Sequence, residues 1–173
     1  EEKNLGRLRL WRKFMKDTQS FLESICQNLN LIETKLMTLT NAFLDSNIIL
    51  YLLDTHTEKS ETAEKLIRQQ PHINAQVLVE VGNVCNRKHK WTKYEVCDFW
   101  YDLMSDCQVS RISEYTLAEA IYLTEKYDFQ LFDAIIVSSA LEAGCRILYS
   151  EDMQHELVVE DRLTIINPFL QAC

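Results

Sequence analysis

Residues 42–54 read AFLDSNIILYLLD: three apolar residues, an aspartate, two short polar residues and a second apolar run. The opening run, Ala42–Leu44, predicts a buried parallel strand, because strands covered on both faces are continuously apolar. Asp45 follows the carboxyl end of this strand, and in open α/β sheets that edge forms the crevice in which ligands bind. Ser46 and Asn47 come next, with short side chains that suit a metal-bound water or a phosphate oxygen. An aspartate that caps a helix after a strand gives the same pattern, so the segment alone leaves a structural role equally open.

Three further acids occupy comparable places: Glu80 in QVLVEVGN, Asp133 in QLFDAIIV and Asp152 in ILYSEDM. Each has an ordinary interpretation, as a solvated edge of a helix face, as the N-cap of a helix that starts at residue 134, and as a turn in which Glu151 competes for the role. Several acids that converge at one sheet edge repel one another unless a hard cation lies among them. The set therefore suggests a magnesium or manganese site, and with it phosphodiester chemistry.

Apolar runs and helical periodicity alternate along the rest of the chain. Further strands are expected near residue 73 and over 107–112, 146–149 and 163–166, and helices over 48–53, 60–70, 76–86, 94–104, 117–127 and 134–143. Alternating strands and helices predict an α/β fold, a three-layer α/β/α sandwich around a mostly parallel sheet.

Residues 1–36 differ from this body. Their apolar residues recur at alternating steps of three and four, which predicts a helix whose seam packs on another surface. A basic flank accompanies the first half of this helix: Arg7, Arg9, Arg12, Lys13 and Lys16. The chain is therefore expected to divide into a helical arm, residues 1–36, and a body, residues 37–173.

The formal net charge of −8 is uneven: residues 1–36 carry +2 and the remainder −10. Because the body is this acidic, it is not expected to bind nucleic acid over a broad surface, but a nuclease with a local basic patch is still compatible with this charge. No run of 18 apolar residues occurs, so we expect no membrane span. The six cysteines and four histidines show no zinc-ligand spacing, and the cysteines suggest buried thiols in a reducing, cytoplasmic compartment.

Taken together, the four acids and their contexts resemble PIN-domain ribonucleases, and among these the VapC-like toxins of bacterial toxin–antitoxin pairs. AFLDSNIILYLLD resembles the family's opening strand with its first acid, INAQVLVEVGNV the segment with the second, and QLFDAIIVSSALEAGC the helix with the third. ILYSEDMQHELVVEDRLTIINPF is similar to the closing segment, where Asp152 matches the fourth acid. The resemblance covers about residues 39–169. It departs from the family at Gln76, where relatives often have a turn led by Ser or Thr, and over residues 1–36, because such toxins usually begin at about Met37.

The resemblance implies an endoribonuclease that depends on Mg²⁺ or Mn²⁺, with Asp45, Glu80, Asp133 and Asp152 as its catalytic acids. Asp45 and Asp133 would ligate the metal, and Glu80 and Asp152 would hold a second ion or metal-bound waters. A metal-activated water then attacks phosphorus and leaves a 5′-phosphate and a 3′-hydroxyl. The resemblance also implies a cognate antitoxin and a homodimer as partners, with transfer RNA as the favoured substrate.

The densest basic and aromatic stretch of the body runs from Arg87 through Lys88 and Lys90 to Tyr94. Together with Ser46 and Asn47, Arg87, Lys88 and Lys90 are the candidate substrate contacts, because cations track an RNA backbone and aromatic rings stack on bases. A solvated helix end whose cations complement the helix dipole explains the stretch equally simply.

For the arm of residues 1–36, two interpretations stay open. Arg9, Arg12 or Lys13 enters the acidic site as an antitoxin residue does, or the helix merely covers an apolar groove or builds a dimer.

Rival functions find less support. A phosphoacceptor receiver domain needs an acidic pair near the first strand and a lysine after the last, which this sequence does not supply. A haloacid-dehalogenase-type phosphatase needs Asp-x-Asp, but Asn47 replaces the second aspartate. A catalytically silent module that keeps the fold for RNA binding or scaffolding remains the alternative, and the presence of all four acids argues against it.

Overall fold

In the computed structural model, which describes residues 41–55 and 57–170, the strands form one sheet around β1. The strands are β1 (Ala42–Leu44), β2 (His72–Asn74), β3 (Gln108–Ser110), β4 (Ile147–Tyr149), β5 (Val158–Val159) and β6 (Leu163–Ile166). Their order across the sheet is β3-β2-β1-β4-β6-β5, and only the β5–β6 pair is antiparallel. Phe43 of β1 lies opposite His72 on one side and Leu148 on the other, so the first strand is central.

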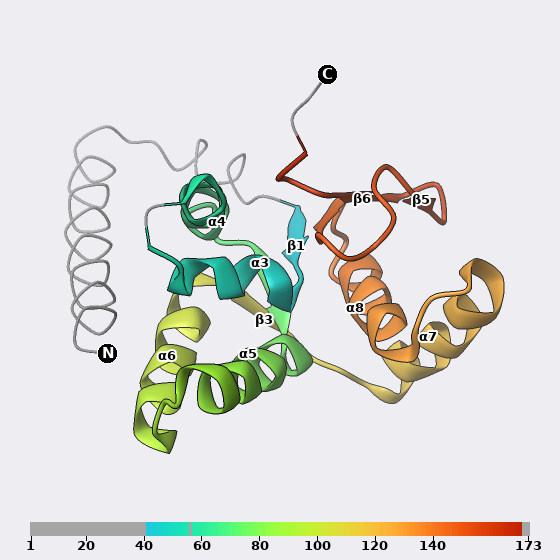
Figure 1. The fold of residues 1–173 in the computed structure, drawn as a ribbon. Helices are drawn as coiled ribbons and strands as arrows, with labels where there is room; N and C mark the ends of the chain where they lie inside the picture. Colours follow the sequence, from blue (N-terminus) through green and yellow to red (C-terminus); the bar gives the residue numbers. More distant parts are fainter. Residues whose placement is uncertain (1–40, 56, 171–173) are drawn as a thin grey trace, which may run out of the picture. The chain divides into compact units, whose positions relative to one another are not determined.

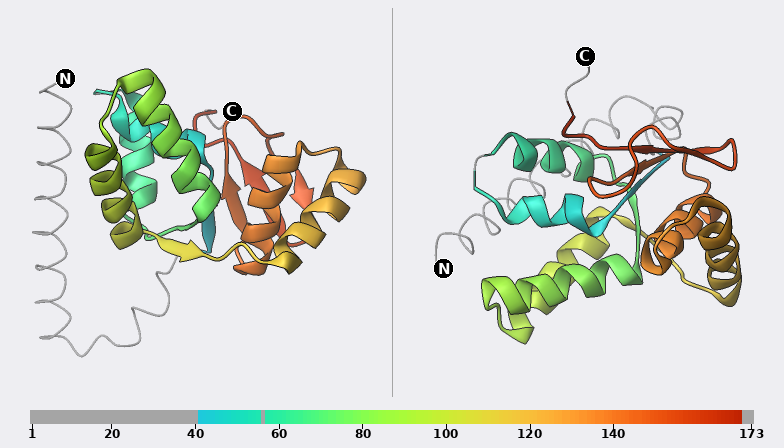
Figure 2. Two further views of the ribbon diagram at one scale, coloured as in Figure 1. Left: turned by 90° about the horizontal axis from the view of Figure 1, so that it is seen from below. Right: turned by 45° about the vertical axis from the view of Figure 1, so that its right-hand side comes forward.

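The helices cover both faces of this sheet. They are α3 (Ser46–Leu50), followed by the 3₁₀ turn η1 (Tyr51–Leu53), α4 (Glu58–Ile67), α5 (Ala75–His89), α6 (Lys93–Asp106), α7 (Glu114–Tyr127) and α8 (Leu131–Glu142). Figures 1 and 2 show α3 to α6 gathered on one side of the strands and α7 and α8 on the other. The predicted three-layer α/β/α sandwich with a mostly parallel sheet is confirmed.

Burial explains why β1 is apolar throughout and why α8 is mostly apolar. All three residues of β1 are buried, and so are the eight consecutive residues Ala134 to Leu141 of α8. This helix contacts β2 and β4 on one side and α7 on the other, so it has hardly any solvated face. A helix covered in this way has apolar residues all round rather than a stripe.

Polar caps fix where the helices that carry the acids begin. Asn74, which is fully buried, accepts a hydrogen bond from Val77 N (3.0 Å) and so caps α5. Its Nδ2 donates to Ser139 Oγ of α8 (2.9 Å). A side-chain bond therefore ties the N-cap of α5, the helix that carries Glu80, to α8, the helix that carries Asp133.

Several element bounds differ from the prediction. The helix expected to begin at residue 134 begins at Leu131, with Gln130 as its N-cap, so the interpretation of Asp133 as an N-cap is wrong. The helix expected from residue 117 begins at Glu114, because Ser113 accepts a bond from Thr116 N and caps it there. Strand β5 was not predicted, because two residues are too few to show a period.

Other predictions concern the ends and the cysteines. The helical arm of residues 1–36 lies outside the described residues, so the division of the chain near residue 36 stays a prediction. Cys85, Cys107 and Cys145 are buried as expected, whereas Cys97 lies on an exposed face of α6, so a buried thiol is wrong there. Within the described ranges, every helix is too short or too polar to cross a lipid bilayer.

Candidate active site

Asp45 stands at the carboxyl edge of the sheet and is almost completely buried, with 7% of its surface exposed. Its backbone N–H donates to Tyr149 O (3.0 Å), which extends the β1–β4 pairing by one step. Its Oδ1 accepts from Ser46 N (2.6 Å), so Asp45 is the N-cap of α3. The cap and a place in the site are therefore not alternatives, because one oxygen caps the helix and the other takes part in a separate network.

The second oxygen of Asp45 belongs to a network that joins β1 to the turn after β4. Ser150 Oγ donates to Asp45 Oδ2 (2.7 Å) and accepts from the backbone N–H groups of Asp152 and Met153, each at 3.3 Å. Asn47 Nδ2 donates to Asp45 Oδ2 (3.0 Å) and to Asp152 Oδ2 (3.1 Å). One amide thus links the first and the fourth acid of the sequence.

Glu80 and Asp133 meet at the starts of α5 and α8. Glu80 lies one turn after Gln76 on α5, and Gln76 Nε2 donates to Glu80 Oε1 (2.8 Å). The same nitrogen donates to the backbone carbonyl of Phe132 (3.1 Å), the residue before Asp133. Gln76 therefore joins the segment of the second acid to that of the third.

The acids act on one another electrostatically. The pKa of Asp45 is raised to about 6, first by burial and further by the negative charges of Glu80 and Asp133, against the lowering effect of its bonds from Ser150 and Ser46. The pKa of Asp133 is also raised, by burial and then by the charges of Glu80 and Asp152. The structure thus brings all four predicted acids into one cluster that is short of positive charge.

The donor set fits a hard divalent cation. Within the described residues, no three or more His, Cys, Asp and Glu side chains are arranged to hold a metal ion by themselves. Mg²⁺ does not need such a cage, because it commonly takes one or two carboxylates and keeps several waters or substrate oxygens. Asp45 and Asp133 offer carboxylate oxygens, and the pKa of each is raised by burial first and then by neighbouring acids, so no cation of the described residues offsets their charge.

Glu151, the competitor of Asp152, is engaged elsewhere. Its carboxylate forms an ion pair with Lys59 of α4 and accepts a hydrogen bond from Tyr51 Oη. Its backbone N–H donates to Asn47 Oδ1 (3.3 Å). In the turn after β4, Asp152 is therefore the acid that meets Asn47, and Glu151 ties the turn to α4.

Two residues of the site carry no role in the sequence-based interpretation: Ser150 and Gln76. The available signal for Ser150 is its position directly after β4, where parallel strands present their side chains to a crevice. The available signal for Gln76 is its spacing of four residues from Glu80, at which helical side chains meet.

The predicted RNA contacts lie at the other end of α5. Arg87 and Lys88 belong to its last turn, and Lys90 is its C-cap in a left-handed conformation with φ of 58°. At about 1.5 Å per residue, Arg87 lies roughly 10 Å along the helix from Glu80. Trp91, part of the same stretch, is buried and packs edge-on against Phe99, so it does not offer its face to a base.

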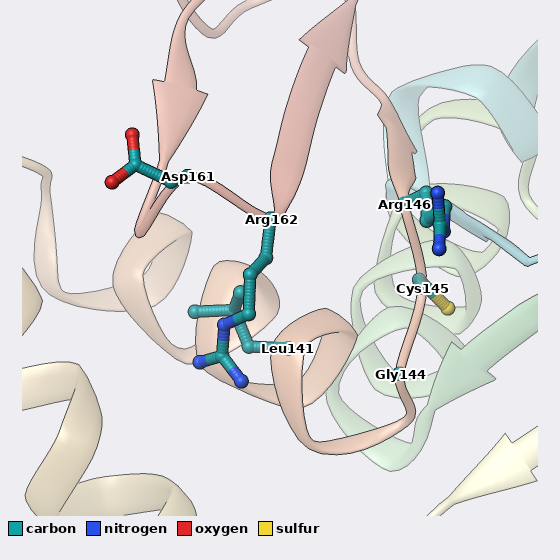
Figure 3. A pocket seen from close by; sticks show the side chains of 6 residues that line it. All are labelled: Leu141, Gly144, Cys145, Arg146, Asp161 and Arg162. Atoms are coloured by element: carbon teal, nitrogen blue, oxygen red, sulfur yellow. The ribbon is translucent and has the colours of Figure 1, made fainter.

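A separate cavity of about 330 Å³ lies at the opposite edge of the sheet, before β4 and β6 (Figure 3). Figure 3 shows the side chain of Arg162 extending along Leu141, whereas Asp161 points away from it. The lining residues are Leu141, Gly144, Cys145, Arg146, Asp161 and Arg162. None of the four acids lines this cavity, so it is distinct from the acidic cluster.

Comparison with known proteins gives independent evidence on the family and the fold of this chain. The family model described as "PIN domain" matches residues 42–159. VapC20 of Mycobacterium tuberculosis, a sarcin–ricin loop cleaving toxin, has a similar fold, with a TM-score of 0.53 and 19% identity over 64% of this chain and 89% of that one. A toxin–antitoxin complex from Klebsiella pneumoniae contains a chain with a TM-score of 0.58 and 19% identity, covering 74% of this chain and 98% of its own. No curated protein matches the sequence.

Proposed function

This chain belongs to the PIN domain family, and from that premise we propose that it is a divalent-metal-dependent endoribonuclease, the toxin of a toxin–antitoxin pair. The observation that carries the proposal is the acidic cluster at the carboxyl edge of the sheet. Asp45 and Asp133 come from elements far apart in the sequence, and each has a pKa raised by burial and by neighbouring acids. Folding brings these negative charges together, which destabilises the folded state. A bound divalent cation would offset this repulsion and could in turn bind an anionic substrate.

In the proposed hydrolysis of a phosphodiester bond, different residues of the chain have different roles. Mg²⁺ or Mn²⁺, when bound, would lower the pKa of a water and stabilise charge on the phosphate. Asp45 and Asp133 would hold it, with Asp45 kept in place by Ser150 and the Ser46 amide. Attack of the water on phosphorus breaks the bond to the 3′-oxygen, which takes up a proton, so the products carry a 5′-phosphate and a 3′-hydroxyl.

Asp152 and Glu80 would accept hydrogen bonds from metal-bound waters. Each is held by an amide nitrogen, Asp152 by Asn47 and Glu80 by Gln76. These contacts set the direction of the carboxylates before a ligand arrives, and such support commonly decides the affinity of a metal site. Arg87, Lys88 and Lys90 remain the proposed contacts to the RNA backbone beyond the cleavage point.

The substrate and partners are proposed by likeness. A transfer RNA is the favoured substrate, and an antitoxin and a second copy of the chain are the expected protein partners. The similar fold in a toxin–antitoxin complex supports an antitoxin, although 19% identity extends only to the fold. A cytoplasmic location agrees with such partners.

The alternative is a catalytically silent PIN-fold module that binds RNA or serves as a scaffold. All four acids and their supporting hydrogen bonds are present, which favours the enzyme. A silent module would bind RNA without any change in the length of the RNA when Mg²⁺ is added.

Purified Asp133→Asn protein tests the proposal. We expect it to lose Mg²⁺- or Mn²⁺-dependent cleavage of RNA while its circular dichroism spectrum stays that of the parent. Asp98→Asn, at an exposed position of α6, is the matched control and should cleave normally. Cleavage by the Asp133→Asn protein at the parental rate would refute the assigned role. Sequencing the ends of RNA cleaved in cells that express the active chain would identify the substrate.

A further inference from the structure

Phe132 stands out among the apolar residues that the fold leaves in solvent. Its surface is 64% exposed although it directly precedes Asp133, one of the acids of the site. Among the described residues, no ring pair and no cation–ring contact includes it. Single exposed apolar side chains are common on protein surfaces, but an exposed aromatic ring directly next to an acid of the site, with Leu131 also exposed, is a candidate contact for a ligand.

The backbone that carries Phe132 is held in place. Gln76 Nε2 donates to the Phe132 carbonyl at 3.1 Å and to Glu80 Oε1 at 2.8 Å, so the same amide supports an acid and the ring's main chain. Phe132 also lies in the first turn of α8, and helical side chains tilt toward the amino end of their helix. The backbone of Phe132 is therefore fixed next to Asp133 by a helix and a side-chain hydrogen bond rather than by a loop.

The same helix end suits an anion. α8 has 12 residues, and its N-cap, Gln130, makes no side-chain capping bond to the first turn. The positive end of a helix dipole favours a phosphate. A nucleotide whose phosphate lies toward the acids and the start of α8 would bring its base over the neighbouring ring.

We propose that Phe132 is a base-stacking residue that selects RNA with an unpaired nucleotide next to the scissile phosphate. This rests on the proposed ribonuclease function and names the substrate class of that same site. A base within a duplex is already stacked on both faces, whereas an unpaired base exposes a face to an aromatic side chain. Leu131, the preceding residue, is also exposed and offers apolar contact without a π-face.

The test uses the full chain carrying Asp45→Asn, so that RNA stays intact, and a single-stranded RNA with one 2-aminopurine. Stacking of this fluorescent base on Phe132 should quench its emission. Phe132→Leu keeps an apolar side chain of similar length, and we expect it to abolish the quenching and weaken binding about tenfold, within the range for one stacked base. Phe132→Trp should restore both.

Tyr115→Leu is the matched control. Tyr115 is 73% exposed on α7, and Thr116 Oγ1 donates to Glu142 at the far end of α8, so this ring lies away from the acids. The control should leave quenching and affinity unchanged. In the active chain, Phe132→Leu should raise KM for single-stranded RNA more than it lowers kcat.

Other outcomes would overturn the inference. Unchanged quenching and KM in Phe132→Leu would exclude stacking even if the parent cleaves RNA, and a change of oligomeric mass in that variant would make Phe132 a contact between copies instead. Quenching that depends on Phe132 in a parent that does not cleave RNA would support the stacking residue and refute the nuclease. Absence of any RNA binding by the parent would overturn both.

Discussion

Replacing Asp45 by asparagine is expected to stabilise the metal-free fold at neutral pH while it removes activity. Asp45 is buried, and its pKa of about 6 compares with an ordinary value of 3.8. Between these values the folded chain holds a proton that the unfolded chain has released, so stability falls as the pH rises through this window. Above pH 6 the folded chain bears the full cost of a buried negative charge.

The size of this cost follows from the shift. About two pKa units correspond to roughly 3 kcal/mol, since one unit is about 1.4 kcal/mol. Asparagine keeps an acceptor for Ser46 N, but its NH2 group replaces the oxygen that accepts from Ser150 Oγ and Asn47 Nδ2, and we subtract about 1 kcal/mol for these changed bonds. The net gain is therefore about 2 kcal/mol, or roughly 4–8 °C in melting temperature for a chain of this size.

The assay is a thermal or urea melt of parent and Asp45→Asn in EDTA at pH 4.5 and pH 7.5. The variant should be more stable at pH 7.5, and the gap should nearly close at pH 4.5, where the parent's Asp45 is largely protonated in the fold. Mg²⁺ should also reduce the gap at pH 7.5, because an ion that binds only the folded parent stabilises it. A gap that is equal at both pH values, or a variant less stable than the parent at pH 7.5, would refute the electrostatic account. Asp98→Asn should show no gap at either pH.

Three further outcomes are expected. Ser150→Ala should lower the free energy of unfolding by about 1–3 kcal/mol in urea melts and slow cleavage, because the backbone amides of Asp152 and of the buried Met153 lose their acceptor; unchanged stability would contradict the network. Gly82→Ala should cost about 1–3 kcal/mol, since a Cβ there would lie 2.8 Å from the Trp100 ring, and a thermal melt at the parental temperature would show that the ring can move. Deleting residues 1–36 should raise the cleavage rate if the arm inhibits or change the mass in light scattering if it builds a dimer, and neither change would exclude both roles.

The sequence predicts the fold well where chemistry is local. Strands β1, β4 and β6 are apolar runs next to polar turns, and α4 to α8 show helical periodicity or a continuous apolar run, so their existence follows from pattern alone. Bounds are less predictable, because they depend on caps. Ser113 begins α7 three residues before its apolar pattern, and Gln130 begins α8 without any capping side chain. The second case gives no sequence signal.

The acids of the site are predictable, but their support is not. Asp45 and Asp152 follow strand ends, and the rule for open α/β sheets places them at one edge. The bond from Gln76 to the Phe132 carbonyl joins residues 56 apart in the sequence, and no local pattern encodes such a pair. The buried state of Trp91 is missed for the same reason, since the partner that covers its ring, Phe99, is on the next helix.

Asn47 shows how the fold holds these charges together before any ion binds. Its Nδ2 lies within hydrogen-bonding distance of Asp45 (3.0 Å), Asp152 (3.1 Å) and Ser150 (3.3 Å), and it brings partial positive charge between two acids. An aspartate at this position would add a further negative charge and remove both donors. The amide does not neutralise the cluster, however, because the pKa of Asp45 remains raised to about 6. The residual deficit of positive charge is what a divalent ion would supply, so a change that relieves it, such as Asp45→Asn, should stabilise the metal-free edge and weaken metal binding.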